Sequence, residues 1–455
     1  MDFIAACLMV LAFAVAGWKI FNRLPSADFA TWPQQKALQS APASNISEQA
    51  ESASLSQQLS PDGRFRFSAQ FVSGAPGQAV HAASIVELRN GGLRAVWFSG
   101  SREGAGDVTI QTAVMDAASM RWQTESTLFD RQKLERGLWR YVKKLGNPVI
   151  ARAPDGSLSL WLVNVSLGGW AGSAVTWSRS VDEGASWSVP KRLVTSPFLN
   201  ISTLVKSAPV PLADGQVYLP VYHEFVTKFA EVLRLSADGQ VVDKIRIPGS
   251  RSSLQPVLLV DDAQKAQIFM RSSHGGFVTA SATGDAGRTW SDTRITSWPN
   301  PDSALAGVVT SGAMQWLALN PTSAGRGILA MLQAPKGGIF DGALQWIVEP
   351  NLTSATRHPA GLSMSNYELA LGQELQARGT SQVQAQSYVA SAKRQLCSAD
   401  NCAQEFSYPY LLQTSDGFIH LVYTWHRTRI RHVRFDPRQT ALASGPVATH
   451  ASSNN

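Results

Sequence analysis

The feature that most restricts the fold of this chain is a succession of short apolar segments joined by tight turns. From about residue 61, alternating apolar runs are broken by Asp-Gly or Asn-Gly pairs, as in APVPLADGQVYLPVYHE and PYLLQTSDGFIHLVYTW. Such a pair between alternating runs is the strongest short-range signal for a β-hairpin. Helical periodicity is nearly absent outside residues 366–396, which we expect to form a short helical insertion. The sequence therefore predicts an all-β protein.

A repeated octapeptide indicates how the hairpins are organised. SVDEGASW and TGDAGRTW, which start at Ser180 and Thr283, share the frame Ser/Thr-x-Asp-x-Gly-x-x-Trp and lie about 100 residues apart. With ~50 residues per four-stranded blade, this spacing corresponds to two blades of a β-propeller. The body over residues 61–440 then has room for six to eight blades, and a β-sandwich is the alternative fold.

The residues of the octapeptide suit a turn better than a reaction. Each copy supplies an acid, a glycine and a tryptophan at fixed offsets: Asp182, Gly184 and Trp187, and then Asp285, Gly287 and Trp290. A carboxylate can accept hydrogen bonds from turn amides, and glycine can adopt the positive φ that such a turn needs. The tryptophans can fold back against the blade. We expect these residues to be structural.

The two ends of the chain differ from this body. Residues 3–18 form an uncharged apolar run that suits a signal peptide or a membrane anchor within residues 1–25. Lys19 and Arg23 follow the run and by the positive-inside rule would keep the body in the cytoplasm. We predict a flexible linker over residues 26–60 and a disordered tail over residues 441–455.

Charge, cysteine content and metal-ligand residues indicate which partners, disulfides and cofactors to expect. The net charge of +7 is mild, and because no block of lysines and arginines occurs, we expect no nucleic-acid partner. Cys397 and Cys402 can close a small disulfide loop in an oxidising compartment, or remain two free thiols. No cluster of ligands indicates a metal, and we expect no cofactor.

The repeated frame resembles the Asp-box of the sialidase (neuraminidase) superfamily. The chain is similar to the bacterial sialidase-like, BNR-repeat-like branch over roughly residues 75–437. This resemblance implies a six-bladed propeller of four-stranded antiparallel blades and an exo-glycosidase acting on sialic acid or a uronic-acid-type sugar. Because polymeric glycans lie outside the cytoplasm, we expect an exported protein, periplasmic or extracellular, with inner-membrane attachment through residues 3–18 as one arrangement. The oligomeric state is left open.

The resemblance also implies a set of site residues. VWFSGSREGAGDVTI matches the acid/base segment and supplies Arg102 and Asp107. QIFMRSSHGGF and NPTSAGRGILAML supply two arginines of the carboxylate-binding triad, Arg271 and Arg326. EFSYPYLLQ supplies the nucleophile, Tyr408.

Two positions depart from the sialidase pattern. The first arginine of the triad falls on His81, and the glutamate that activates the tyrosine falls on Gln255. Glu224 and Glu405 are the candidate replacements for that base, with Glu224 assigned to the catalytic set. Arg64 and Arg66 are candidate replacements for the arginine. The expected substrate-binding set is His81, Arg102, Gln255, Arg271 and Arg326.

The residue types allow three functions. In a sialidase-type glycosidase, arginines bind the substrate carboxylate bidentately, a tyrosine attacks, and a carboxylic acid protonates the leaving group. In a polysaccharide lyase, His81 or Tyr408 would remove the proton beside a uronate carboxyl while arginines stabilise the developing charge. The third function is a non-catalytic glycan-binding propeller that serves envelope polysaccharide assembly.

Overall fold

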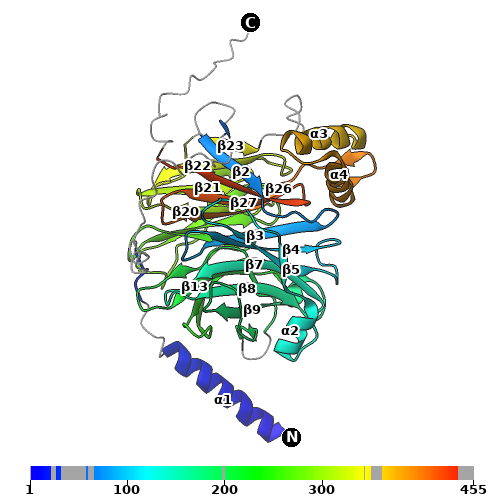
Figure 1. Ribbon diagram of the computed structural model, residues 1–455. Helices are drawn as coiled ribbons and strands as arrows, with labels where there is room; N and C mark the ends of the chain where they lie inside the picture. Colours follow the sequence, from blue (N-terminus) through cyan, green and yellow to red (C-terminus); the bar gives the residue numbers. More distant parts are fainter. Residues whose placement is uncertain are drawn as a thin grey trace.

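The chain folds into a six-bladed β-propeller, which confirms the predicted fold class (Figure 1). The computed structural model describes residues 2–21, 27–31, 58–59, 66–196, 200–342, 344–349 and 361–438. Residues 22–26, 32–57, 60–65 and 439–455 lie outside this description, and with them Arg64, most of the predicted linker and the predicted tail.

The first three blades follow one another along the chain. Blade 1 comprises β3 (Ala79–Glu87), β4 (Leu93–Gly100), β5 (Thr109–Met115) and β6 (Ser126–Phe129). Blade 2 comprises β7 (Lys144–Arg152), β8 (Leu158–Val165), β9 (Ser173–Ser180) and β10 (Lys191–Arg192). Blade 3 comprises β11 (Leu204–Val205), β12 (Val210–Pro211), β13 (Val217–His223), β14 (Phe229–Leu235) and β15 (Val241–Arg246).

The last three blades close the ring. Blade 4 comprises β16 (Ser253–Val260), β17 (Ala266–Ser272), β18 (Phe277–Thr283) and β19 (Arg294–Pro299). Blade 5 comprises β20 (Ala306–Val309), β21 (Met314–Leu319), β22 (Leu329–Pro335) and β23 (Trp346–Glu349). Blade 6 comprises β26 (Phe406–Gln413), β27 (Ile419–Trp425) and β28 (Arg429–Phe435), with β2 (Arg66–Phe71) and β1 (Gln58–Leu59) added from the N-terminal side.

Blade 6 joins the two ends of the propeller domain. β2 pairs with β28 antiparallel, from Phe67 opposite Phe435 to Phe71 opposite Arg431. The Phe435 ring also contacts Trp316 and Trp346 of blade 5, with centroids 5.4 and 5.2 Å apart. Ring closure therefore depends on both backbone pairing and aromatic packing between neighbouring blades.

The inner strands of a blade are more deeply buried than its outer strand. Every residue of β8, LSLWLVNV, is buried, because this strand lies between neighbouring strands and between neighbouring blades. The outer strand β15, VVDKIR, is only partly buried and carries its charges at the rim. Burying a Val, Leu or Ile side chain stabilises the fold by roughly 1.5–3 kcal/mol, so the apolar inner strands supply most of the driving force.

A helical insertion separates blades 5 and 6, as predicted for residues 366–396. α3 (Met364–Ala377) and α4 (Gln382–Leu396) pack on each other beside the ring (Figure 1). Hydrogen bonds from Tyr388 and Ser391 to the carbonyls of Gly74 and Gln78 attach α4 to the segment before β3. After α4, the short hairpin β24 (Cys397–Ser398) and β25 (Asn401–Cys402) is closed by a disulfide between its two cysteines.

The N-terminal helix α1 (Asp2–Phe21) projects away from the propeller (Figure 1). Several of its apolar side chains, including Leu8 and Phe13, are largely exposed. Among the described residues, no helix has the length and apolarity needed to cross a membrane. Part of the segment expected to be a linker is docked, because Phe29 is buried against Tyr218 and its amide donates to the Ala263 carbonyl.

The two octapeptides form equivalent turns at the outer edges of blades 2 and 4. Asp182 accepts hydrogen bonds from the amide and hydroxyl of Ser186, at 2.9 and 2.5 Å, and Asp285 does the same with Thr289 at 2.9 and 2.6 Å. The bonds from Ser186 lower the pKa of Asp182 to about 2. Gly184 adopts a φ of 88°. Both carboxylates are therefore engaged within their own turns.

The second glycine and the two tryptophans are also part of the structure of these turns. Gly287 adopts a φ of 83°. The indole nitrogen of Trp187 donates to the Gly184 carbonyl at 3.1 Å, and Trp290 is buried with Tyr218.

Buried histidines predict a loss of stability in acid. His420 and His432 stack in blade 6 with Nδ1 and Nε2 2.9 Å apart, and burial lowers the pKa of His420 to about 3. Because an unfolded histidine titrates near ~6.5, the unfolded state binds more protons below that pH. Each such histidine should remove about 1.4 kcal/mol of stability per pH unit as pH falls from ~6.5 toward the folded value.

Denaturant unfolding between neutral pH and pH ~4 measures this slope. His420→Gln should flatten it, whereas the same substitution at the exposed His274 should leave it unchanged. An unchanged slope in His420→Gln would assign the acid sensitivity to other groups.

Candidate active site

The candidate site is built on one backbone feature that recurs in all six blades. The innermost strand of each blade carries, in its first half or just before its start, a residue with a φ between 43° and 60°. These residues are Ala82, Asn147, Ser202, Gln255, Asp302 and Tyr408. Residues other than glycine rarely adopt this backbone conformation, and residues with such strain cluster at functional sites. Four of these positions, in β3, β7, β16 and β26, are register shifts in the strand pairing.

Side chains from several of these positions meet around Tyr408. The amide nitrogen of Gln255 donates to the phenol oxygen of Tyr408 at 3.0 Å and to that of Tyr222 at 3.3 Å. Asn147 donates to the same Tyr222 oxygen at 3.2 Å. The Oε1 atom of Gln255 accepts from Arg271 at 2.9 Å. One hydrogen-bond network therefore joins blades 2, 3, 4 and 6, and it includes three residues that the sequence predicted.

Arg271 and Arg326 approach the cluster from blades 4 and 5. Arg271 pairs through Nε with Asp302 at 2.6 Å, and Arg326 donates through Nη2 to the Asp302 carbonyl at 2.8 Å. Arg326 also forms an ion pair with Glu405 at 3.4 Å. Both arginines are mostly buried, so their orientation is fixed by these partners rather than by solvent.

A third arginine, Arg427, enters from the turn between β27 and β28. Its Nε pairs with Glu405 at 2.9 Å and its Nη1 with Glu103 at 3.1 Å. Its carbonyl accepts from the Val80 amide at 2.9 Å, next to His81. Arg427 thus lies beside the position where the sialidase pattern places its first arginine. Arg427 was not predicted from the sequence, although its turn, TWHRTR, has charged residues where other hairpins have Asp-Gly.

Glu405 is the buried carboxylate that holds two of these arginines. Burial alone would raise its pKa, but Arg427 and Arg326 outweigh burial and hold the pKa well below its ordinary value. Ser407 donates to Oε1 of the same carboxylate at 2.5 Å. A carboxylate with this many partners remains ionised, so its role here is to hold the arginines rather than to accept a proton.

His81 lies against Tyr408, with ring centroids 4.1 Å apart. Its Nδ1 is 2.9 Å from the Thr424 hydroxyl, and its Nε2 is buried and has no hydrogen-bond partner among the residues that the structure describes. Burial, followed by the charge of Arg427, lowers the pKa of His81 well below its ordinary value. The imidazole is therefore neutral and does not supply the positive charge of the arginine that it replaces.

Asp107 and Glu224, the two carboxylates expected to transfer protons, lie in different environments. Asp107 is exposed, and its oxygens accept from the amide and hydroxyl of Ser101, both at 3.0 Å. Arg102 is also exposed. In the same loop it is Glu103 that contacts an arginine of the cluster, Arg427. Burial raises the pKa of Glu224, which follows β13 near Arg271 and Asp302.

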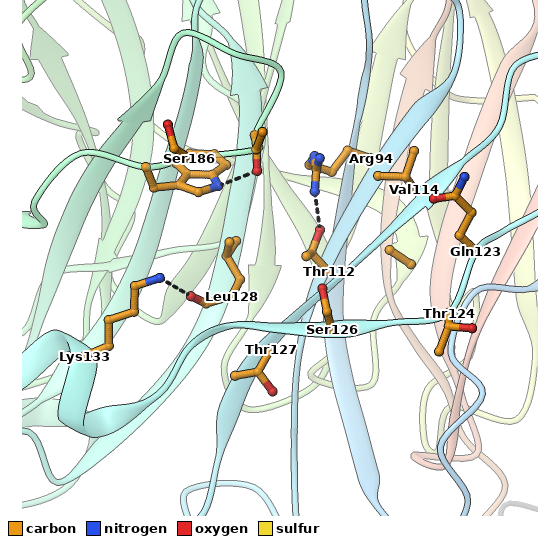
Figure 2. A pocket seen from close by; sticks show the side chains of 14 residues that line it. Arg94, Thr112, Val114, Gln123, Thr124, Ser126, Thr127, Leu128, Lys133 and Ser186 are labelled. Atoms are coloured by element: carbon orange, nitrogen blue, oxygen red, sulfur yellow. Dashed lines mark hydrogen bonds between the residues drawn. The ribbon is translucent and has the colours of Figure 1, made fainter.

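A separate hollow of about 420 Å³ lies between blade 1 and the outer turn of blade 2 (Figure 2). Its lining includes Arg94, Thr112, Lys133 and Ser186, and Lys133 donates to the Leu128 carbonyl at 2.9 Å. None of the residues around Tyr408 lines it. Within the described part of the chain, no three His, Cys, Asp or Glu residues are arranged to hold a metal ion.

The fold and this central cluster define a sialidase-like β-propeller. The chain belongs to the BNR repeat-like domain family, whose pattern matches residues 91–421. No curated protein matches it.

Solved structures with the same fold are distant in sequence. The Hadza microbial sialidase Hz136 aligns with 13% identity and a TM-score of 0.57, over 79% of this chain and 66% of its own. The intramolecular trans-sialidase from Ruminococcus gnavus, solved with oseltamivir carboxylate, aligns with 11% identity and a TM-score of 0.56, over 81% and 96%. A protein of unknown function from Dyadobacter fermentans aligns with 9% identity and a TM-score of 0.56, over 81% and 97%. The chain thus spans just under two thirds of Hz136, and these similarities establish the fold alone.

Proposed function

We propose that this protein is a sialidase-type exo-glycosidase that removes a carboxylated sugar from glycans or exopolysaccharide. The observation that carries the proposal is the Tyr408 phenol, which accepts a hydrogen bond from Gln255 and interacts electrostatically with Arg271 and Arg427. Arg326 shares the Glu405 carboxylate with Arg427. Arginine binds carboxylates through paired, charge-assisted hydrogen bonds. Arg271, Arg326 and Arg427 would hold the substrate carboxylate and orient the reacting carbon toward Tyr408.

In the proposed reaction, Tyr408 acts as the nucleophile. Its phenol proton is released to water, and the phenolate oxygen attacks the anomeric carbon to form a covalent glycosyl-enzyme bond. The bond from that carbon to the leaving oxygen breaks, and the electron pair stays with the oxygen, which takes a proton. Water then hydrolyses the intermediate and restores Tyr408.

We assign the leaving-group proton to Glu224 rather than to Asp107. A general acid must be protonated at the working pH, and burial favours this for Glu224 because it raises the pKa of the carboxyl group. The Asp107 oxygens instead accept hydrogen bonds from Ser101. Glu224→Gln should therefore lower kcat by about 10²–10⁴-fold, and Asp107→Asn should have a smaller effect.

The proposal is tested by incubating the purified full chain with sialosides and with uronate-containing polysaccharides. We expect release of a saturated acidic monosaccharide, measured as new reducing ends. Arg271→Ala should raise KM by about 10- to 100-fold, because a charge-assisted contact is lost. If no sugar is released, and wild type and Arg271→Ala bind the glycan with the same affinity, then the cluster around Tyr408 is not the glycan site.

A lyase is the second candidate, and it is favoured by Gln255 and His81. A side-chain amide can hydrogen-bond a substrate carboxyl without repelling it, and the Nε2 of His81, which has no partner among the described residues, could take a proton. A lyase product is unsaturated and absorbs in the ultraviolet, so the same incubations distinguish the two reactions. Binding without either product would favour the glycan-binding propeller. For all three functions we propose an exported protein, periplasmic or extracellular.

A further inference from the structure

The hollow between blades 1 and 2 lies apart from the cluster around Tyr408. Arg94, in its lining, is the second residue of β4, and Gly184 follows the end of β9. Because neighbouring strands are antiparallel, β4 begins and β9 ends on the face opposite the one where β3 and β7 begin. The Tyr408 cluster is built at the beginnings of the inner strands, so the two places can be occupied at the same time.

The lining of the hollow is mostly polar and includes two positive charges. Figure 2 shows Arg94 and Lys133 approaching it from different sides, with the hydroxyls of Thr112 and Ser126 between them. Arg94 donates through Nη1 to the Thr112 hydroxyl at 3.2 Å, and Lys133 donates to the Leu128 carbonyl at 2.9 Å. Within the part of the chain that the structure describes, neither cation forms an ion pair.

Two acids act on Arg94 electrostatically, and both are engaged elsewhere. Asp182 accepts hydrogen bonds within its own turn. The Glu183 carboxylate pairs with Arg89 and Arg152, and only its backbone carbonyl accepts from Nε of Arg94, at 3.0 Å. Guanidinium and ammonium groups carry several N–H donors each. Both cations of the hollow therefore retain donors that no described residue uses.

The second octapeptide provides an internal comparison. In both octapeptide turns, the second residue of the preceding blade's second strand donates to the carbonyl just before the turn glycine. That residue is Arg94 at the first octapeptide and Tyr218 at the second. Trp290 is only 7% exposed and shares one apolar cluster with Tyr218. Trp187 remains half-buried at the border of the hollow.

The strand register shows a further difference between the two places. Thr112 lies opposite Val96 and lines the hollow. Val232 lies opposite Pro220 at the equivalent register of blade 3 and is buried in the apolar cluster. Polar side chains thus surround an open space between blades 1 and 2, where blades 3 and 4 have packed apolar ones. Such a lining suits a polar ligand.

We propose that this hollow is a second glycan-binding site, which takes a carboxylated sugar unit. The carboxylate would bind between Arg94 and Lys133, because hydrogen bonds between ionised partners are the strong ones. The Ser126 hydroxyl would bond to sugar hydroxyls. Trp187 offers an apolar ring surface, since its indole nitrogen donates to the Gly184 carbonyl at 3.1 Å.

The size of the hollow fits this ligand class. Its volume of about 420 Å³ lies within the range of roughly 300–1,000 Å³ that is typical of small-molecule sites. The site goes beyond the proposed reaction, because it would hold an acidic glycan on the protein whether or not Tyr408 cleaves it.

Isothermal titration calorimetry tests the site in the full chain carrying Arg271→Ala, which weakens binding at the Tyr408 cluster. We expect trigalacturonate to bind, and the neutral maltotriose to bind at least about 10-fold more weakly. Adding Lys133→Met should weaken trigalacturonate binding by about 10-fold, because a charge-assisted contact is lost. Adding Ser126→Trp should abolish binding, because the indole would fill the hollow while both cations remain.

Lys191→Met is the matched control for Lys133→Met. Both lysines are exposed, and each ammonium lies over an aromatic ring, 4.6 Å from the centroid of Phe129 for Lys133 and 5.8 Å from that of Trp177 for Lys191. Lys191 does not line the hollow, so its substitution should leave the affinity for trigalacturonate unchanged.

The outcomes separate this inference from the proposed function. Unchanged affinity in both Lys133→Met and Ser126→Trp, with thermal unfolding as in the parent protein, would overturn the second site. Absence of trigalacturonate binding, or equal affinity for maltotriose, would also overturn it. A wild-type protein that releases no sugar, in which the hollow binds trigalacturonate as expected, would retain the second site and reject the glycosidase.

Discussion

Tyr408→Phe should lower kcat/KM on the cleaved glycan by about 10³-fold or more and leave the protein folded. The phenol oxygen is the proposed nucleophile, and removing a nucleophile typically abolishes the covalent route. The structural cost should be small, because among the described residues the hydroxyl forms one hydrogen bond, with Gln255, and the ring remains in place. Steady-state kinetics, with thermal unfolding as the measure of folding, checks both parts.

Tyr410→Phe is the matched control for this variant. Tyr410 is the second residue after Tyr408 in β26, is similarly buried, and donates its hydroxyl to the Ile150 carbonyl. Its loss should reduce stability slightly and leave kcat within a few-fold of wild type. Equal losses of activity in the two variants would show that packing, rather than a nucleophilic oxygen, is what the site requires at Tyr408.

Glu405→Gln should lower the free energy of unfolding by about 3–5 kcal/mol. Removing one partner of a buried ion pair leaves the other charge without compensation, and here Arg326 and Arg427 both lose their carboxylate. Denaturant unfolding at neutral pH measures the change. Glu368→Gln is the control, because Glu368 pairs with Lys393 at an exposed site and such pairs contribute less than about 1 kcal/mol.

The pH dependence of the same variant gives an independent check. The pKa of Glu405 is lower in the folded protein than in the unfolded chain, so its contribution is complete above the unfolded value of ~4.3. This contribution is lost as pH falls from that value toward the folded pKa. Wild type and Glu405→Gln should therefore approach each other in stability in acid. A constant difference between them would place the effect in packing instead.

Much of the architecture could be predicted from the sequence because it depends on local signals. Asp-Gly turns and alternating apolar runs specify hairpins within about ten residues, and the two octapeptides specify their own turns through Asp182 and Asp285. The helical insertion was located for the same reason. The docking of Phe29 could not be predicted, because a single phenylalanine in a polar segment does not indicate which blade covers it.

The candidate site was only partly predictable. Arg271, Arg326 and Tyr408 were identified through resemblance, and the structure brings them together around Gln255 and Asp302. Asp107 was identified in the same way, but the carboxylate of its loop that contacts an arginine is Glu103.

The sequence by itself determined the hairpins, their turns and the position of the helical insertion, since each follows from neighbours along the chain. Only the tertiary structure decided which charges face one another. Arg427 meets Glu103 across more than 300 positions of sequence, and Lys206 meets Pro409 across about 200. These contacts exist because β2 pairs with β28 and closes the six blades into a ring, which brings residues from distant parts of the sequence together. Burial at that centre is a property of the closed ring, and burial is the main cause of the shifted pKa values of Lys206, Glu224 and His81.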